Sequence, residues 1–186
     1  MEAVAEALIV VDMQCAFVNG STAVPSADEV KVAVDQLLTL ARASGSLVVH
    51  LQNDGPAGAV DEPATPGWHL AHAPWADEPV IRKRDDDGFV DTGLGSVLRD
   101  HQVKTVVLCG VQSEMCVAAT TRGAMQRGLT VVLPRDAHGT YPVPADDARG
   151  IAVPAAYVRR VAEWSLSDEV LAPASVDDVS FTRSTR

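Results

Sequence analysis

Short apolar runs rich in β-branched residues alternate with helical patterns along most of this chain. The runs cover Ala7–Gln14, Leu47–Gln52, Lys104–Val111 and Leu129–Ala137, with a brief one at Val80–Lys83. Each is short and mostly apolar, which is typical of strands buried on both faces of a parallel sheet. The first constraint on the fold is therefore a set of parallel strands whose connections must cross over the sheet.

Helical patterns fill most of these connections. The clearest covers Ser26–Gly45, where Ser26 and Glu29 have capping-box spacing and a glycine follows the last apolar turn. Other helices are predicted at Leu94–Gln102, Glu114–Gly128 and Ala155–Leu166. This alternation predicts an α/β fold, a doubly wound three-layer sandwich with a mainly parallel central sheet. No repeat or linker interrupts it, so a single domain is expected over residues 1–186.

The formal net charge of the chain is −10. An acidic chain has no basic field with which to bind a phosphate backbone, so nucleic-acid binding is not expected. The charge is compatible with a cationic or neutral small substrate, and equally with solubility alone. No apolar run is long enough to span a membrane, and no basic residue precedes the first apolar run as in a signal peptide. We therefore expect a cytoplasmic protein that binds no membrane.

The stretch Val106–Gly128 carries a cysteine just after a strand and a turn. If Ser113 caps the following helix, Cys116 occupies its first turn, where free backbone N–H groups and the helix dipole favour a thiolate. The alternative is a cysteine that packs as a small hydrophobic residue, as expected for Cys109 and Cys15. With three cysteines and no CxxC pair, neither a disulfide framework nor a zinc motif is predicted.

Two charged residues lie at other predicted strand ends. Asp12 follows the first apolar run, where partial burial would raise the pKa of its carboxyl towards that of a general base. Lys83 ends the brief run, and its ammonium would favour a nearby thiolate. Taken alone, Asp12 could instead organise a loop or cap a helix, and Lys83 could lie on the surface. Because ligands bind beyond the carboxyl ends of parallel strands, Asp12, Lys83 and Cys116 form a candidate base, cation and nucleophile.

With these residues in place, the chain resembles the isochorismatase-like cysteine hydrolases, a superfamily that includes nicotinamidases and carbamoyl-amide hydrolases. The matching segments run in order along nearly the whole chain, at Ala7–Val18, Ile81–Leu94, Val106–Ala137 and Pro154–Ser165. The resemblance implies a catalytic triad of Asp12, Lys83 and Cys116. It also implies a cis peptide bond between Val111 and Gln112, and an oxyanion hole formed by the N–H groups of Gln112 and Cys116.

The resemblance breaks at the metal site that nicotinamidases carry. Those members have an Asp-x-His pair and a further histidine after the second strand, whereas here Asp54 is followed by a glycine and a proline. His69 and His72 have helical spacing but no third ligand, so neither a metal nor a cofactor is expected. The Gly67–Trp68 pair, within the long loop Asn53–Pro79, resembles metal-free members, among them streptothricin hydrolase-like amidases, which open a lactam.

The predicted function is a cysteine hydrolase that cleaves an amide or lactam C–N bond of a small molecule through a thioester, without metal. Phe17, Trp68 and Ser113 are predicted to bind substrate, with core packing and loop anchoring as the alternatives for Phe17 and Trp68. His138, at another strand end, faces either the pocket or a neighbouring subunit. Two other functions stay open, an isochorismatase-type vinyl ether hydrolase and a catalytically idle interaction module. The resemblance also implies a homodimer or homotetramer.

Overall fold

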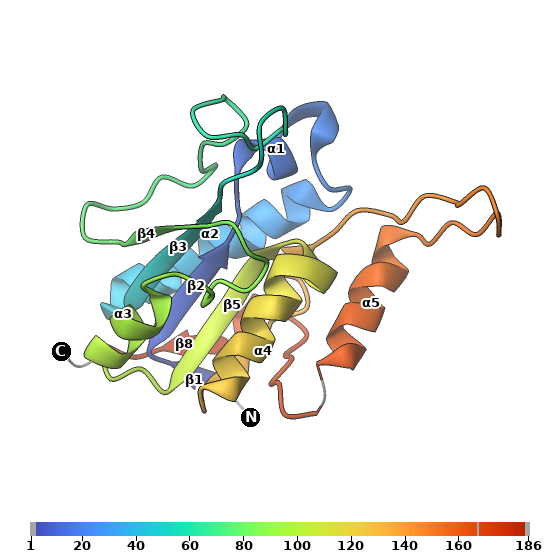
Figure 1. Ribbon diagram of the computed structural model, residues 1–186. Helices are drawn as coiled ribbons and strands as arrows, with labels where there is room; N and C mark the ends of the chain where they lie inside the picture. Colours follow the sequence, from blue (N-terminus) through green and yellow to red (C-terminus); the bar gives the residue numbers. More distant parts are fainter. Residues whose placement is uncertain (1–2, 167, 185–186) are drawn as a thin grey trace.

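A parallel sheet forms the centre of the protein (Figure 1). The structure is a computed structural model that describes residues 3–166 and 168–184. Within them the strand order is β4-β3-β2-β5-β6, and β7 pairs with the end of β5. These strands are β2 Ala7–Val11, β3 Leu47–Asn53, β4 Val80–Lys83, β5 Thr105–Val111, β6 Thr130–Val132 and β7 His138–Gly139. Every one of these pairings is parallel, as the alternating pattern predicted.

The strand order reverses between β2 and β5, near the middle of the sheet. From β2 the chain adds β3 and β4 on one side, whereas β5 and β6 lie on the other. In register, Val11 pairs with Leu51 of β3 and Gly110 of β5, so these three strands end side by side. In a doubly wound sheet the crevice for a ligand lies at such a reversal, beyond the carboxyl ends of the strands.

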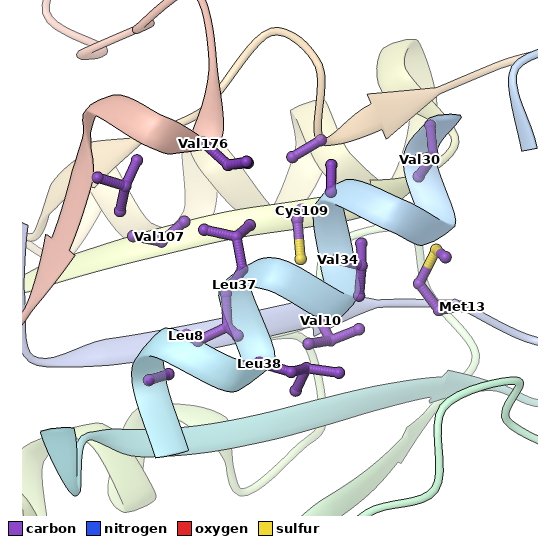
Figure 2. Packing of buried hydrophobic residues seen from close by; sticks show 14 of the residues in the cluster. Leu8, Val10, Met13, Val30, Val34, Leu37, Leu38, Val107, Cys109 and Val176 are labelled. Atoms are coloured by element: carbon purple, nitrogen blue, oxygen red, sulfur yellow. The ribbon is translucent and has the colours of Figure 1, made fainter. Parts of the chain in front are cut away.

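One face of the sheet is covered by α2 (Ala27–Ser44). Its buried residues include Val30, Val34, Leu37 and Leu38, which pack with Leu8 and Val10 of β2 and with Cys109 of β5 (Figure 2). The helix ends at Gly45, whose φ of 70° lies in the left-handed region and whose N–H donates to the last turn. The predicted glycine stop is confirmed. Ser26 makes no side-chain capping hydrogen bond, so the capping box expected from its spacing does not form.

The opposite face is covered by α3 (Leu94–Asp100) and α4 (Ala118–Gln126). Both bury apolar side chains in a second core cluster, which includes Ile9, Val49, Leu94, Leu98, Leu108 and Ala124. Helices on both faces confirm the predicted α/β three-layer fold. The last helix, α5 (Ala155–Ser165), lies beside α4, and an extended arm that joins it to β7 projects from the body (Figure 1).

Shorter elements complete the description. A four-residue helix α1 (Cys15–Val18) and two 3₁₀ turns (Gly20–Thr22 and Val176–Asp178) lie in the connections. A separate pair of parallel strands joins β1 (Ala3–Ala5) to β8 (Val179–Phe181). The strand β1 was not predicted, because three residues carry too weak a pattern. Among the described residues, no helix combines the length and the apolar character needed to cross a bilayer.

Two predicted elements are shorter than expected. The strand predicted at Leu129–Ala137 ends at Val132, because Pro134 has no N–H to donate and Leu133 bonds instead to the carbonyl of Leu171. The helix predicted at Glu114–Gly128 is split. Its first residues belong to a wide π-type turn, Ser113–Val117, which we call the cysteine turn, and regular α4 begins only after it.

Candidate active site

The three predicted catalytic residues meet at the carboxyl end of the sheet. Asp12 directly follows β2, and its N–H donates to the carbonyl of Leu51 in β3 at 3.1 Å. Lys83 is the last residue of β4 and pairs in register with Asn53, the last residue of β3. Cys116 lies in the cysteine turn that follows β5. Neighbouring parallel strands therefore bring residues that are far apart in sequence to one edge of the sheet.

The Lys83 ammonium lies between the other two groups. Its Nζ is 2.8 Å from Asp12 Oδ2 and 3.3 Å from Cys116 Sγ. It also donates to the Asp85 carbonyl at 3.2 Å and approaches Asn53 Oδ1 at 3.5 Å. Lys83 and Asp12 are each only 2% exposed. The surface lysine considered as an alternative is excluded, because this ammonium is buried and held by four contacts.

Burial and mutual charge set the proton affinities of these groups. Burial raises the pKa of the Asp12 carboxyl, and the Lys83 ammonium offsets only part of the rise. Burial alone would lower the pKa of Lys83, but Asp12 and Cys116 together bring it above its usual value. Burial also raises the pKa of the Cys116 thiol, and the Asp12 carboxylate adds to that rise. The resting site thus combines a neutral thiol, an ammonium and a carboxylate with increased proton affinity, which suits general-base activation.

The expectation that Cys116 lies in the first turn of a helix capped by Ser113 is wrong. Cys116 does not occupy the first turn of a regular helix, since Met115 before it has φ −105° and ψ −106° and α4 starts at Ala118. Ser113 does not cap the turn with its side chain. Cys116 therefore does not lie at a regular helix end, where the helix dipole would favour a thiolate, and burial beside a carboxylate raises the pKa of its thiol.

The peptide bond between Val111 and Gln112 is cis, as predicted. The carbonyl of Gln112 then accepts the N–H groups of Met115 at 3.2 Å and Val117 at 3.1 Å, which closes the cysteine turn. Of the two residues predicted to supply an oxyanion hole, Gln112 directly precedes the cysteine turn and Cys116 lies within it.

A second carboxylate, which sequence reasoning missed, lies next to the sulfur. The Cys116 thiol donates to Asp86 Oδ1 at 3.4 Å, whereas Asp12 Oδ1 is buried and has no hydrogen-bond partner among the described residues. Asp86 itself is exposed. The only signal for it was the run of three aspartates that follows Lys83 and Arg84. The sulfur therefore has one buried and one exposed carboxylate close to it.

Comparison with known proteins agrees with this geometry. A sequence model described as the isochorismatase domain matches residues 6–164. The chain belongs to the isochorismatase family. Two relatives from Streptomyces noursei, both named streptothricin hydrolase, are 58% and 56% identical over 167 residues, which is 89% of this chain. The aligned part is 66% of one relative and 60% of the other, so the chain spans less than two thirds of their length.

Solved structures of the isochorismatase family share the whole fold. An isochorismatase from Pseudomonas putida KT2440 has a TM-score of 0.85 and 26% identity, and the match covers 94% of this chain and 90% of that one. A cysteine hydrolase from Pseudomonas syringae pv. phaseolicola has a TM-score of 0.83 and 26% identity, over 92% and 89% of the two chains. The resemblance to isochorismatase-like cysteine hydrolases is confirmed.

The long loop after β3 is fixed near Asp12 by side-chain amides. The carbonyl of Trp68 accepts hydrogen bonds from Gln14 Nε2 at 3.0 Å and Gln52 Nε2 at 2.9 Å. Gln14, fully buried, also bonds both backbone groups of Asn53. Gly67 must be a glycine, because a Cβ there would lie 2.1 Å from a backbone carbonyl. Sequence reasoning missed Gln14, although a glutamine two residues after Asp12 was a visible signal.

The predicted substrate-binding residues differ in where they lie. Trp68 is half-buried, donates from Nε1 to Asp54 at 3.0 Å, and stacks under the Arg82 guanidinium. Phe17 is half-buried and packs against the core that α2 covers. At least part of its ring therefore serves core packing, the alternative considered for this residue. Ser113 is 1% exposed and its hydroxyl bonds His138 rather than facing the rim. The structure does not bring Ser113 to a surface that a substrate touches.

The region that holds metal in nicotinamidases is organised differently here. Both Asp54 oxygens are bound by Arg82, at 2.9 Å and 2.7 Å, and His72 lies 3.3 Å from Asp35 on α2. His69 is exposed. Within residues 3–166 and 168–184, no three His, Cys, Asp or Glu side chains are grouped so that they could hold a metal ion.

A cleft opens beside the triad on the side of β4. Its volume is about 620 Å³, and Lys83, Asp85, Asp54 and Arg82 are among its lining residues. The Lys83 that contacts the sulfur is therefore also part of the cleft wall. A cleft of this size accommodates a small molecule, and its charged lining favours a polar one.

Proposed function

We propose that the protein is an amidase, a hydrolase that cleaves an amide or lactam C–N bond of a small molecule with Cys116 as nucleophile. The observation that carries the proposal is the position of the Lys83 ammonium, 2.8 Å from Asp12 Oδ2 and 3.3 Å from Cys116 Sγ. A buried cation that touches both a sulfur and a carboxylate stabilises the thiolate as the thiol proton moves to the carboxylate. A buried ion pair of this kind is not needed for core packing, because apolar side chains of similar volume stabilise a core as well or better.

The proposed reaction follows from these contacts. The thiol turns from Asp86 to Asp12 Oδ1, whose lone pairs have no partner among the described residues, and transfers its proton there. The Cys116 thiolate attacks the carbonyl carbon, and the N–H groups of Gln112 and Cys116 bind the oxyanion. Protonated Asp12 gives its proton to the leaving nitrogen as the C–N bond breaks. Water, deprotonated by Asp12, then hydrolyses the thioester and releases the acid and the free thiol.

The substrate class is supported by the relatives and by the charge of the site. The two relatives from Streptomyces noursei are named streptothricin hydrolase, and a more distant relative from Variovorax paradoxus, 28% identical over 70% of this chain, is named ureidoacrylate amidohydrolase. We propose streptothricin or another cationic amide as the substrate. Exposed Asp86 beside the sulfur, together with a net charge of −10, favours a cation near the scissile bond.

Activity with and without the nucleophile tests the proposal. Streptothricin and a panel of primary amides and lactams are incubated with the protein, and hydrolysis is followed by mass spectrometry. We expect Cys116→Ala to lower turnover at least about 10³-fold, since a triad nucleophile is removed. Cys15→Ala, a half-exposed cysteine near the same edge, is the matched control and should keep full activity. A trapped acyl adduct at Cys116 would support the thioester.

Two outcomes would contradict the proposal. If Cys116→Ala keeps its activity on an amide, the covalent mechanism is wrong. If the protein hydrolyses a vinyl ether such as isochorismate and no amide, the alternative chemistry of the family applies. The homodimer or homotetramer stays a prediction, which light scattering of the purified chain tests.

A further inference from the structure

A second buried polar pair joins the cysteine turn to β7. Ser113 Oγ and His138 Nδ1 are 2.8 Å apart, and each residue is only 1% exposed. Neither takes part in the reaction proposed above. The imidazole still buries one nitrogen, Nε2, without a hydrogen-bond partner among the described residues, which is costly, so an apolar pair would be more favourable in the core. The pair therefore calls for an explanation other than packing.

Charges around the imidazole define which nitrogen carries the proton. Burial lowers the pKa of His138 to about 3, with nearby Arg159 adding to the effect, so the ring is neutral at ordinary pH. Its Nε2 has no hydrogen-bond partner among the described residues and lies 3.8 Å from Glu163 Oε1 on α5. A carboxylate at that distance favours the tautomer with hydrogen on Nε2. Nδ1 then accepts a hydrogen bond from the Ser113 hydroxyl.

Glu163 is itself held by arginines. Arg159 Nε lies 4.0 Å from Glu163 Oε1, and Arg135 Nε lies 3.8 Å from Oε2, while the Glu163 side chain is only 9% exposed. These contacts hold the Glu163 carboxylate between the two arginines and the imidazole. The protonated Nε2 and the accepting Nδ1 of His138 are thus fixed from the side of α5.

The backbone of His138 is tied to the same turn. The short strand β7 pairs with the end of β5, with Gly110 opposite His138 and Val111 opposite Gly139. The cis peptide and the cysteine turn follow at once. His138 is therefore attached by its backbone to the residues before Gln112 and by its side chain to the residue after it.

We propose that Ser113 and His138 are positioning residues that hold the cysteine turn so that the N–H groups of Gln112 and Cys116 point at one oxyanion. Ser113 lies between these two donors in the sequence, and its hydrogen bond to His138 fixes the turn against β7. The inference rests on the proposed amidase function. Oxyanion donors act only in the transition state, so a loosened turn lowers kcat and leaves substrate affinity largely intact.

The test replaces His138 by side chains whose amide lies where one or the other imidazole nitrogen was. Asn at position 138 puts a polar group near Nδ1, whereas Gln puts it near Nε2. With streptothricin as substrate, we expect Ser113→Ala and His138→Gln to lower kcat about 10- to 100-fold, the range that a small misplacement of catalytic groups produces. His138→Asn should keep a kcat much closer to that of the unsubstituted protein. The double variant Ser113→Ala/His138→Gln should lose no more than the worse single variant, because both break one link.

Two readouts separate positioning from general damage. KM and the rate of Cys116 alkylation by iodoacetamide should stay within about twofold of the unsubstituted protein, because the Lys83 and Asp12 contacts are untouched. Thr140→Val is the matched control. Thr140 is also 1% exposed and its hydroxyl has no partner among the described residues, but it lies outside the turn and should leave kcat unchanged.

Specific results would overturn the inference. Ser113→Ala with unchanged kcat, or equal losses for His138→Asn and His138→Gln, would show that the hydrogen bond does not position the turn. A raised KM at unchanged kcat would assign Ser113 to substrate binding instead. Cys116→Ala is measured beside these variants. If Cys116→Ala is active, the amidase proposal itself fails. If Cys116→Ala is inactive and Ser113→Ala is fully active, only the present inference fails.

Discussion

Replacing Lys83 by methionine tests the electrostatic core of the site. The methionine keeps most of the length of the side chain and removes the ammonium, which lies 3.3 Å from Cys116 Sγ. At that separation and an effective dielectric constant of about 20, an ammonium and a thiolate attract each other by about 5 kcal/mol. Each 1.36 kcal/mol corresponds to a tenfold change in rate, so losing all of this attraction would slow the reaction of Cys116 about 10³- to 10⁴-fold.

The observed decrease in the reactivity of Cys116 should be smaller, because the protonation of Asp12 also changes. Without the ammonium, the buried Asp12 carboxylate takes up a proton more readily and then no longer repels the thiolate. We therefore expect alkylation of Cys116 by iodoacetamide at pH 7.5 to slow about 100- to 1000-fold. The rate is read from the Cys116 peptide by mass spectrometry, which separates it from buried Cys109 and half-buried Cys15.

Two controls accompany this measurement. Lys31→Met removes an ammonium from an exposed pair with Asp28 and should leave the alkylation rate unchanged. The double variant Asp12→Asn/Lys83→Met removes the buried pair completely. It should regain the thermal stability that Lys83→Met loses, but not the reactivity, since a lone buried carboxylate is destabilising and a neutral pair is not. Alkylation within threefold of the unsubstituted rate in Lys83→Met would refute the reasoning.

Three further predictions concern other parts of the molecule. Burial raises the pKa of Glu78, but hydrogen bonds led by Arg42 bring it down to about 2. Glu78→Gln should therefore lower the free energy of unfolding, measured in urea at pH 7, by about 1–2 kcal/mol. The difference in stability between the two proteins should shrink as the pH falls from about 4.5 towards 2. Gly110→Ala should prevent soluble expression, because φ is 119° and a Cβ would lie 2.0 Å from a backbone carbonyl of β2, whereas Gly128→Ala, with open space around it, should fold. Asp86→Asn should raise KM for streptothricin about 2- to 5-fold and leave KM for a neutral amide unchanged, as expected for the loss of one solvent-exposed ion pair. An equal effect on both substrates would contradict its role in recognising cations.

Most of the fold could be predicted from local pattern. The apolar runs that became β2, β3 and β5 are buried on both faces, so their composition is unambiguous, and α2 shows both its apolar face and its glycine stop. The predictions failed where a single backbone angle decides the outcome. The helix predicted at Glu114–Gly128 is interrupted because of the dihedral angles of Met115, which no residue pattern predicts.

The site could be predicted in part for a similar reason. Asp12, Lys83 and Cys116 each end or follow a strand, so the parallel sheet alone brings them together. Asp86 reaches the sulfur through the path of the loop after β4, which is not periodic. Ser113 and His138 are 25 residues apart and meet only because β7 pairs with β5. Contacts made by irregular segments need coordinates.

The amide of Gln14 joins the two ends of a long loop segment. It bonds the backbone of Asn53 and the carbonyl of Trp68, so both ends of the intervening segment are fixed to a buried residue that lies two positions after Asp12. Between these anchors, residues 56–60 are mostly exposed. Loops of other lengths can therefore be grafted into that stretch while the nucleophile and its neighbours keep their places.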